Sequence, residues 1–447
     1  MLDQQFYQNK KFHEFLNSNF ILYRASRGDK NGDQVFKRFN IRATPTTMVI
    51  DSDGSEIDWH VGYGPPADKF LAQLEKTVKG IDTFKSLSER YGKEPKNVEV
   101  VFKLARKWDR KYDQEKAAEL YKEVLVLDPD GKMGMTDYGD VKVTYTEYAE
   151  YSLGALALFG RPMDIEPMKA FIKKYPESKM LSSAYMRLSS YYRTRGSKEE
   201  ATQFFEEYTY KFPEDPYVLR SYISRIIRNK DNIEKGIELA EKIKDIMKYN
   251  PDPRYQKDLA ELYMLKEDKD KADEAFGKRF MEGKVSGLAY DLVDYANFWV
   301  KHNTNIESAE EMMELAIKLA PDRWYTYRYA AEMYLRLKKD EKALEKFGPE
   351  FIKKYDDDAS ILNSYAWFWA NQAKNLESAL EVSKKSVALA PSSYNWDTLS
   401  LVYTKLKKYD EALKAAEKAV ELSDEQSKIR YQNRIKQIKK AMEKEKK

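Results

Sequence analysis

The sequence contains no cysteine. A chain without thiols has no disulfide, no thiolate metal site and no cysteine nucleophile. Long apolar runs are also missing, because no stretch approaches the roughly 18 consecutive apolar residues of a membrane-spanning helix. The residues present therefore exclude dithiol chemistry, and we expect no membrane insertion.

Histidine is scarce, with only His13, His60 and His302. None has a second His or a Glu at the spacing of a metal site, so solvated or half-buried side chains are the better interpretation. The segment 29–33 has its Gly at the wrong place for a calcium loop. Motifs for a serine nucleophile and for phosphate binding are absent too. We expect no metal, no cofactor and no enzyme activity from the residues given.

Charge is nearly balanced, with 78 basic and 74 acidic residues mixed along the chain. Nucleic-acid binding needs clustered Lys and Arg, and the one basic run, residues 430–447, is interpreted as a solvated final helix. We therefore expect no nucleic-acid partner. Apolar residues make up 42% of the chain, which argues against disorder, and 447 residues exceed one compact core.

A small residue recurs at a nearly fixed period between two helical patterns. From Ala201 onward the spacings run from 33 to 37 residues, and Pro167 marks one further repeat before it. The Gly/Asp-rich stretch 128–140 is interpreted as an inserted loop. The recurring small residues are Ala117, Ala201, Gly236, Ala272, Ala309, Ala343, Ala379 and Ala412.

The repeats resemble the tetratricopeptide repeat in period and in pattern. The last one carries the matching residues Trp396, Leu399, Ser400, Tyr403, Ala412 and Ala419, with Ser in place of the usual Gly. The resemblance implies about nine repeats over 98–424, each of two antiparallel helices stacked on its neighbours. The expected fold is a mostly α, tetratricopeptide α-solenoid, wound as a right-handed superhelix with a concave inner surface. Residues 425–447 are expected to form a C-terminal capping helix.

Residues 1–80 do not follow this period and are expected to form a small, partial α/β domain, joined to the repeats by a linker helix at 81–97. Apolar periodicity predicts three helices, at 2–17, 34–39 and 67–79. Runs of β-branched and apolar residues predict three strands, at 20–25, 46–50 and 56–61, with a hairpin turn at Asp53-Gly54.

This order resembles the thioredoxin fold from its second helix onward. The residues that carry the resemblance are the segment Phe39–Thr46, the turn at 51–54 and Gly62-Tyr63. It implies that Thr44 and Pro45 form the cis-proline loop that borders the family's active site. The first two strands and the Cys-x-x-Cys turn are missing, and the turn would fall just upstream of Met1. Either the chain start cuts the domain short, which we favour, or the domain is natively reduced.

The resemblance also implies where a partner would bind, because the family's inner surface is lined by the first helix of each pair. Counting back from the small residues predicts a groove that holds an extended peptide through aromatic and Arg–carboxylate contacts. The alternative is that these rings pack between repeats. The Lys/Asn clamp of relatives that grip C-terminal carboxylates is not reproduced. The groove residues are Arg187, Arg193, Tyr222, Arg225, Tyr295, Phe298, Tyr329, Tyr365 and Phe368.

Two functions follow from these patterns. The first is a non-catalytic scaffold that binds a protein or peptide on the concave face of the solenoid. The second is a thiol–disulfide oxidoreductase whose Cys-x-x-Cys segment lies upstream of this chain. Carbohydrate or lipid handling rests on the 33 tyrosines alone. A cytoplasmic location is expected for the chain as given, and a periplasmic or secreted one if a signal peptide precedes it.

Overall fold

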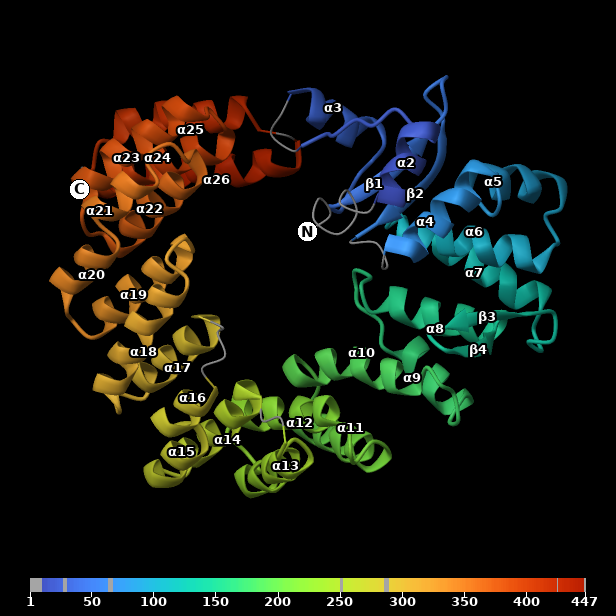
Figure 1. Cartoon of the computed structure of the whole chain (residues 1–447), viewed down its shortest axis with the longest axis horizontal. Helices are drawn as coiled ribbons and strands as arrows, with labels where there is room; N and C mark the ends of the chain where they lie inside the picture. The colour runs from blue at the N-terminus through green and yellow to red at the C-terminus, as the bar shows by residue number, and fades with distance from the viewer. Residues whose placement is uncertain are drawn as a thin grey trace. The chain divides into compact units, whose positions relative to one another are not determined.

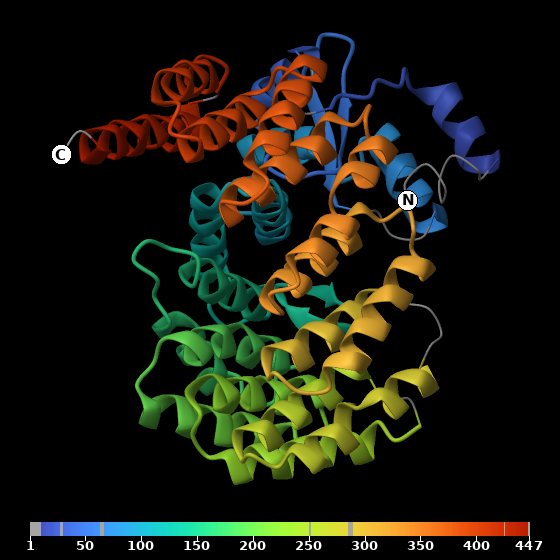
Figure 2. The same ribbon diagram turned by 90° about the vertical axis from the view of Figure 1, so that its left-hand side faces the viewer.

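The computed structural model describes residues 10–26, 30–62, 67–249, 252–284, 289–423 and 425–445 (Figures 1 and 2). The chain divides into two compact units, residues 1–222 and 223–447, which are described separately. The division falls inside helix α12, Pro216–Asn229.

The first part of unit 1 is a small α/β segment. Strand β1 (Thr46–Ile50) pairs antiparallel with β2 (Glu56–Val61), and Met48 lies opposite Trp59. Its helices are α2 (Lys10–Asn19), α3 (Lys30–Arg38) and α4 (Ala67–Val78). Its core contains Phe12, Leu16, Val49, Phe70, Leu71 and Leu74.

Both strands of this sheet, the helix near 67–79 and the cis Thr44–Pro45 bond agree with the predictions. The helix predicted at 34–39 begins earlier, at Lys30, and the described part of the helix predicted at 2–17 begins at Lys10. Residues 1–9 and Tyr63 lie outside the described residues.

The strand predicted at 20–25 is wrong, because these residues form no ladder and Ile21 is 101% exposed. Among the described residues the sheet consists of β1 and β2 alone, so no neighbouring strand hydrogen-bonds to this segment. A run of β-forming residues becomes a strand only with such a partner.

The rest of unit 1 is a series of helix pairs that follows helix α5 (Phe84–Lys93). Side-chain caps begin several helices; Asn97, for example, accepts from the backbone of Val100, and Ser197 forms a capping box with Glu200. The pairs are α6 (Val98–Arg110) with α7 (Gln114–Leu127), α8 (Tyr145–Ala157) with α9 (Glu166–Lys174), and α10 (Leu181–Thr194) with α11 (Lys198–Lys211).

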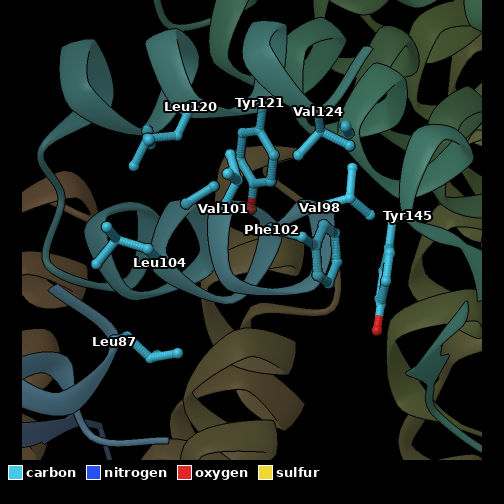
Figure 3. Packing of buried hydrophobic residues seen from close by; sticks show 12 residues of the cluster. Leu87, Val98, Val101, Phe102, Leu104, Leu120, Tyr121, Val124 and Tyr145 are labelled. Carbon is cyan, nitrogen blue, oxygen red and sulfur yellow. The ribbon is translucent and has the colours of Figure 1, made fainter. Parts of the chain in front are cut away.

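The core of the first pair shows how the units stack (Figure 3). Phe102 of α6 stacks on Tyr145 of α8, with ring centroids 4.5 Å apart. Leu87 of α5 and Tyr121 of α7 belong to the same buried cluster. Each helix pair therefore completes its core with residues of its neighbours.

The segment between α7 and α8 was expected to be a loop, and this prediction was incomplete. It contains a β-hairpin, strands β3 (Met135–Tyr138) and β4 (Val141–Thr144), paired antiparallel. Apart from Asp137 in β3, the Gly and Asp residues that suggested a loop belong to the hairpin turn and to the segment that leads into β3.

Unit 2 continues the series in the part of the chain that the structure describes. Helix α12 is followed by α13 (Ile233–Ile246). The later first helices are α14 (Pro253–Leu265), α17 (Ala289–Lys301), α19 (Trp324–Arg336), α22 (Ala359–Gln372) and α24 (Ser393–Lys405). The corresponding second helices are α15 (Lys269–Phe276) with α16 (Lys278–Lys284), α18 (Ile306–Leu319), α20 (Asp340–Lys346) with α21 (Pro349–Lys354), α23 (Leu376–Leu389) and α25 (Tyr409–Glu421).

The recurring small residues all lie in the second helix of a pair and are all buried. Small side chains are needed there because the helices of a pair approach closely. The last described helix is α26 (Glu425–Glu445), which packs Ile438 against Ala412 and Ala416 of α25. The helix-pair architecture predicted from the period is confirmed within each unit.

Candidate functional site

Most of the predicted groove residues lie in the protein interior. Six of the nine are buried, so they cannot contact a ligand in this conformation, and the packing alternative describes them. These are Tyr222, Arg225, Tyr295, Phe298, Tyr365 and Phe368.

The two aromatic pairs of unit 2 pack against a break in the preceding second helix. Tyr295 and Phe298 each lie 5.5 Å from the ring of Phe276, after which α15 ends and α16 begins. The pair Tyr365 and Phe368 lies 5.1 and 5.3 Å from Phe347, at the break between α20 and α21.

At each break a glycine allows the close approach of a backbone carbonyl, and a Trp indole donates a hydrogen bond to another. A Cβ on Gly277 would lie 2.2 Å from the Asp273 carbonyl oxygen, and one on Gly348 would lie 2.0 Å from that of Leu344. The carbonyl that the first break frees, that of Phe276, accepts a hydrogen bond of 3.0 Å from the Trp299 indole. At the second break, Trp369 donates to Phe347 over 2.9 Å.

Sequence reasoning missed these breaks, although a signal exists. Phe-Gly recurs at 276 and 347, and Tyr-Ala-x-Phe-Trp recurs at 295–299 and 365–369. Positions that share a five-residue pattern with a buried Trp are core positions rather than groove positions.

The other two buried residues are held by neighbours as well. Tyr222 stacks on Phe205 with ring centroids 5.2 Å apart. The guanidinium of Arg225 lies 3.5 Å from the Asp231 carboxylate. Both side chains therefore serve packing and pairing inside the array.

The remaining three predicted residues, Arg187, Arg193 and Tyr329, are half-buried. Tyr329 carries the Arg328 guanidinium over its ring at 4.6 Å. Arg193 lies in the last turn of α10. Arg187 belongs to a larger set of cationic and aromatic side chains in unit 1.

We call this set the basic–aromatic surface; it consists of Arg106, Arg110, Tyr148, Tyr151 and Arg187. The residues come from the first helices α6, α8 and α10 of three successive pairs. Arg106 lies over the Tyr148 ring at 5.0 Å. Arg187 lies over the Tyr151 ring at 5.4 Å and donates from Nε to the phenol oxygen over 2.7 Å. Arginine on aromatic faces is a common arrangement of recognition surfaces.

Arg110 is the exposed cation of this surface. Among the described residues, no hydrogen bond or ion pair engages its guanidinium. Desolvation by the surrounding protein, and then the positive charge of Arg106, lower the pKa of Arg110. An arginine remains charged despite such a shift, so Arg110 offers its donors to an incoming anion.

One carboxylate, Asp109, lies within electrostatic range of all three arginines. Burial raises its pKa, and the Tyr121 hydroxyl, which donates over 3.4 Å, and the arginines oppose that rise. Arg110 is also within electrostatic range of Asp58, whose carboxylate is paired with Lys107. The three arginines therefore leave the basic–aromatic surface with an excess of positive charge.

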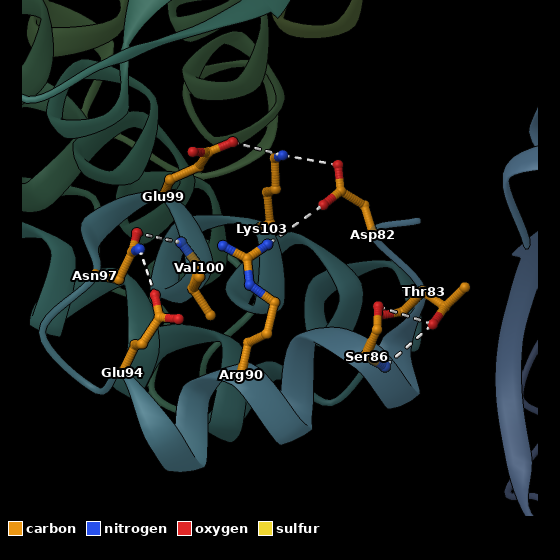
Figure 4. A network of polar contacts seen from close by, with 9 residues as sticks. All are labelled: Asp82, Thr83, Ser86, Arg90, Glu94, Asn97, Glu99, Val100 and Lys103. Carbon is orange, nitrogen blue, oxygen red and sulfur yellow. Dashed lines mark hydrogen bonds and ion pairs between the residues drawn. The ribbon is translucent and has the colours of Figure 1, made fainter. Parts of the chain in front are cut away.

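The neighbouring lysine of α6 does not add to this excess (Figure 4). Lys103 lies 2.7 Å from Asp82 and 2.6 Å from Glu99, and Arg90 lies 3.9 Å from Asp82. These contacts fix α5 against α6 and neutralise the charges on that side.

The thioredoxin-like segment is docked on the same helix. Lys107 of α6 bonds both carboxylate oxygens of Asp58 on β2, over 2.5 and 2.6 Å, and Lys111 pairs with Glu56. Trp59, Phe84 and Trp108 pack in series, with centroids 4.5 and 4.9 Å apart.

The predicted cis-proline loop lies at this junction. Arg42, two residues before Thr44, donates to the Tyr112 carbonyl at the α6–α7 turn over 2.8 Å, and the Pro45 carbonyl accepts from the backbone of Gly62. The loop is therefore tied both to β2 and to the first helix pair.

Among the described residues, no group of three His, Cys, Asp or Glu side chains could hold a metal ion. Across the same residues, no helix has the length and apolar character needed to cross a membrane.

Two family models match parts of the chain. A thioredoxin-like domain matches residues 1–77, and the family of Chs5p-Arf1p-binding proteins (ChAPs) matches residues 346–442. No curated protein matches the chain.

Several solved structures resemble the fold at low identity. A tetratricopeptide repeat protein from Parabacteroides merdae is 14% identical, over 71% of this chain and 98% of that one, with a TM-score of 0.33. Yeast Tom70 is 12% identical, over 84% of this chain and 87% of that one, with a TM-score of 0.32. A chain of the APC/C hetero-tetramer Cut9–Hcn1 is 12% identical, over 84% of this chain and 79% of that one, with a TM-score of 0.26.

The match over residues 1–77, taken with the helix pairs described above, confirms a thioredoxin-like segment followed by tetratricopeptide-like helical repeats.

Proposed function

We propose that this protein is a non-catalytic scaffold whose basic–aromatic surface binds an extended, acidic segment of another protein. The observation that carries the proposal is the exposed guanidinium of Arg110, which pairs with none of the described residues and belongs to the same set as two arginines that lie over tyrosine rings. This surface includes Arg187, one of the predicted groove residues, and the proposal keeps the predicted Arg–carboxylate bonds as its mode of binding.

The chemistry of the surface favours a carboxylate-bearing partner. Guanidinium groups bind carboxylates through paired, charge-assisted hydrogen bonds, which are roughly twice as strong as neutral ones. The half-buried Tyr148 ring adds apolar contact at low entropic cost, whereas Tyr151 is buried and holds Arg187 in place. An extended segment suits a surface built from parallel first helices, because it crosses several of them in turn.

The C-terminal match supports protein binding in a general way. The family that matches residues 346–442 is described as Chs5p-Arf1p-binding, so its members bind proteins. We extend protein binding, but not those particular partners, to this chain.

The test is the affinity for a fluorescein-labelled peptide of alternating glutamate and tyrosine, measured by fluorescence anisotropy. Arg110→Ala is expected to weaken binding by about 10-fold or more, because a hydrogen bond to a charged group contributes about 1.5–3 kcal/mol. Binding should also weaken as salt concentration rises.

The matched control is Arg279→Ala, which removes another exposed arginine, on α16 of unit 2. A peptide of alternating lysine and tyrosine is the control ligand. Equal affinities of Arg110→Ala and Arg279→Ala, or equal binding of the two peptides, would contradict the proposal.

The opposite effect is expected for Asp109→Asn, which removes the negative charge among the three arginines. The asparagine oxygen still accepts from the Tyr121 hydroxyl, so the fold should be kept. The same anisotropy assay should show tighter binding of the acidic peptide, by a few-fold, since Coulomb attraction to the arginines no longer competes. Unchanged or weaker binding would argue that Asp109 does not screen this surface.

Asp109→Asn should also change how stability depends on pH. The native pKa of Asp109 lies above the ordinary value of 3.8, so the native state binds the proton more readily than the unfolded chain. The contribution of Asp109 to stability is therefore lost as pH rises from about 3.8 through the native pKa. Urea unfolding should show the variant to be more stable than wild type at pH 7, with the difference vanishing in acid.

A further inference from the structure

We propose that the β3–β4 hairpin is an internal competitor that covers the basic–aromatic surface and must move aside when an acidic segment binds. This inference rests on the proposed function and concerns the regulation of that same surface. The hairpin lies on the helices that form the surface, binds one of its arginines, is held by few contacts and leaves Arg110 accessible.

The hairpin contacts all three helices that form the surface. Thr136 of β3 accepts a hydrogen bond of 3.1 Å from Arg106 of α6. Tyr138, at the end of β3, lies 6.3 Å from the Tyr148 ring and 6.2 Å from the Tyr151 ring, both on α8. Figure 1 shows β3 and β4 beside α8, which both strands contact.

Tyr138 also reaches the third helix. Its hydroxyl lies 2.6 Å from the Ser183 hydroxyl on α10, 45 residues further along the chain. A single side chain of an inserted segment thus bridges two successive helix pairs. The hairpin occupies the position that an extended ligand of this surface would need.

The part of the hairpin beyond its base is weakly held. Each strand has four residues, and Val143 is the one residue of the two strands that is buried. Met135 and Asp137 are exposed. The base of the hairpin is fixed, because Thr144 caps α8 and the Tyr145 N–H donates to the Gly134 carbonyl. A two-stranded hairpin is marginally stable without packing, so beyond this base the position of β3 depends mainly on Thr136 and Tyr138.

The bonds that hold the hairpin are weaker than those that an acidic ligand would make. Thr136 gives Arg106 a neutral hydroxyl as acceptor, whereas a ligand would give it a carboxylate, and charge-assisted bonds are about twice as strong. Arg110, which the hairpin leaves without a described partner, can bind the ligand first. A carboxylate of the ligand then replaces the Thr136 hydroxyl as the acceptor for the Arg106 guanidinium, and β3 is displaced.

The experiment measures the affinity of wild type, Tyr138→Phe and Tyr138→Ala for the fluorescein-labelled glutamate–tyrosine peptide. Tyr138→Phe removes the bond to Ser183 and keeps the ring, so we expect binding about two-fold tighter than wild type. Tyr138→Ala removes the ring as well, and we expect binding about five-fold tighter or more. Tyr210→Ala, which removes an exposed tyrosine of α11, is the matched control and should bind as wild type does.

Hydrogen exchange of residues 135–144 gives a second readout. The exchange of this segment should become faster when the peptide is added, and Arg110→Ala should abolish that change. Weaker or unchanged binding by both Tyr138 variants would overturn the competition, because the hairpin would then belong to the binding surface or lie outside it. Absence of peptide binding by wild type and both variants would overturn the proposed function, and this inference with it.

Discussion

Lys107→Ala is expected to lower the unfolding free energy of unit 1 by about 3–5 kcal/mol, because it removes one partner of a buried ion pair. Lys107 bonds both oxygens of Asp58, and the two side chains are only 16% and 4% exposed. Without the ammonium, the Asp58 carboxylate remains buried with an uncompensated charge. Urea unfolding followed by circular dichroism at pH 7 measures the loss.

Two variants show whether the pair or the packing matters. The double replacement Asp58→Leu with Lys107→Met should recover most of the lost stability, since apolar residues often replace a buried ion pair at little cost. Lys103→Ala, which breaks the more exposed pairs with Asp82 and Glu99, should cost about 1 kcal/mol or less. If Lys107→Ala lowers the unfolding free energy no more than Lys103→Ala does, the contact between β2 and α6 is not held by its buried charges.

Trp369→Ala is expected to lower the unfolding free energy of unit 2 by about 3–5 kcal/mol, the usual cost of truncating a buried aromatic residue. Trp369 is 1% exposed, and its indole satisfies the Phe347 carbonyl at the break between α20 and α21. Trp369→Phe fills most of the space but leaves that carbonyl without its donor, so it should cost about 1–3 kcal/mol. Urea unfolding of both variants separates packing from hydrogen bonding.

The chain offers a matched control two residues earlier. Trp367 lies on the same helix and is 42% exposed, so Trp367→Ala should change stability by about 0.5 kcal/mol at most. Comparable losses for Trp367→Ala and Trp369→Ala would contradict the role assigned to the helix break. Trp299→Phe, at the first break, should behave like Trp369→Phe.

The period of the small residues was enough to predict the helix pairs, because close approach of two helices restricts side-chain size at one position per repeat. The same reasoning failed for Tyr295 and Tyr365, since it counted from that position without knowing that the preceding second helices break. The break is visible in sequence only when Phe-Gly at 276 and 347 is compared across repeats.

The basic–aromatic surface was predicted only in part. The groove residues were counted from Ala201 onward, so the count included Arg187 and did not reach the arginines of α6. Arg106 and Arg110, four residues apart on a helix, could have been recognised as neighbours on one face. The position of the β3–β4 hairpin could not have been predicted, because it depends on the contact between Tyr138 and Ser183, which are far apart in the sequence.

The helix breaks of unit 2 have a consequence for which blocks of the chain can be exchanged. Trp299 and Trp369 follow broken second helices, whereas the equivalent residue after the unbroken α18 is the buried Met333. Successive repeats of unit 2 are therefore joined in two ways, one with a Trp at a broken helix and one with Met333 after an unbroken helix. Trp299 and Trp369 are 70 residues apart, which is the length of two repeats. Deletion of one repeat would bring Met333 against the break at Gly277 and leave the Phe276 carbonyl without a donor. The block that can be deleted or inserted is therefore a pair of successive repeats, and shortened or lengthened arrays should differ from the natural one by two repeats at a time.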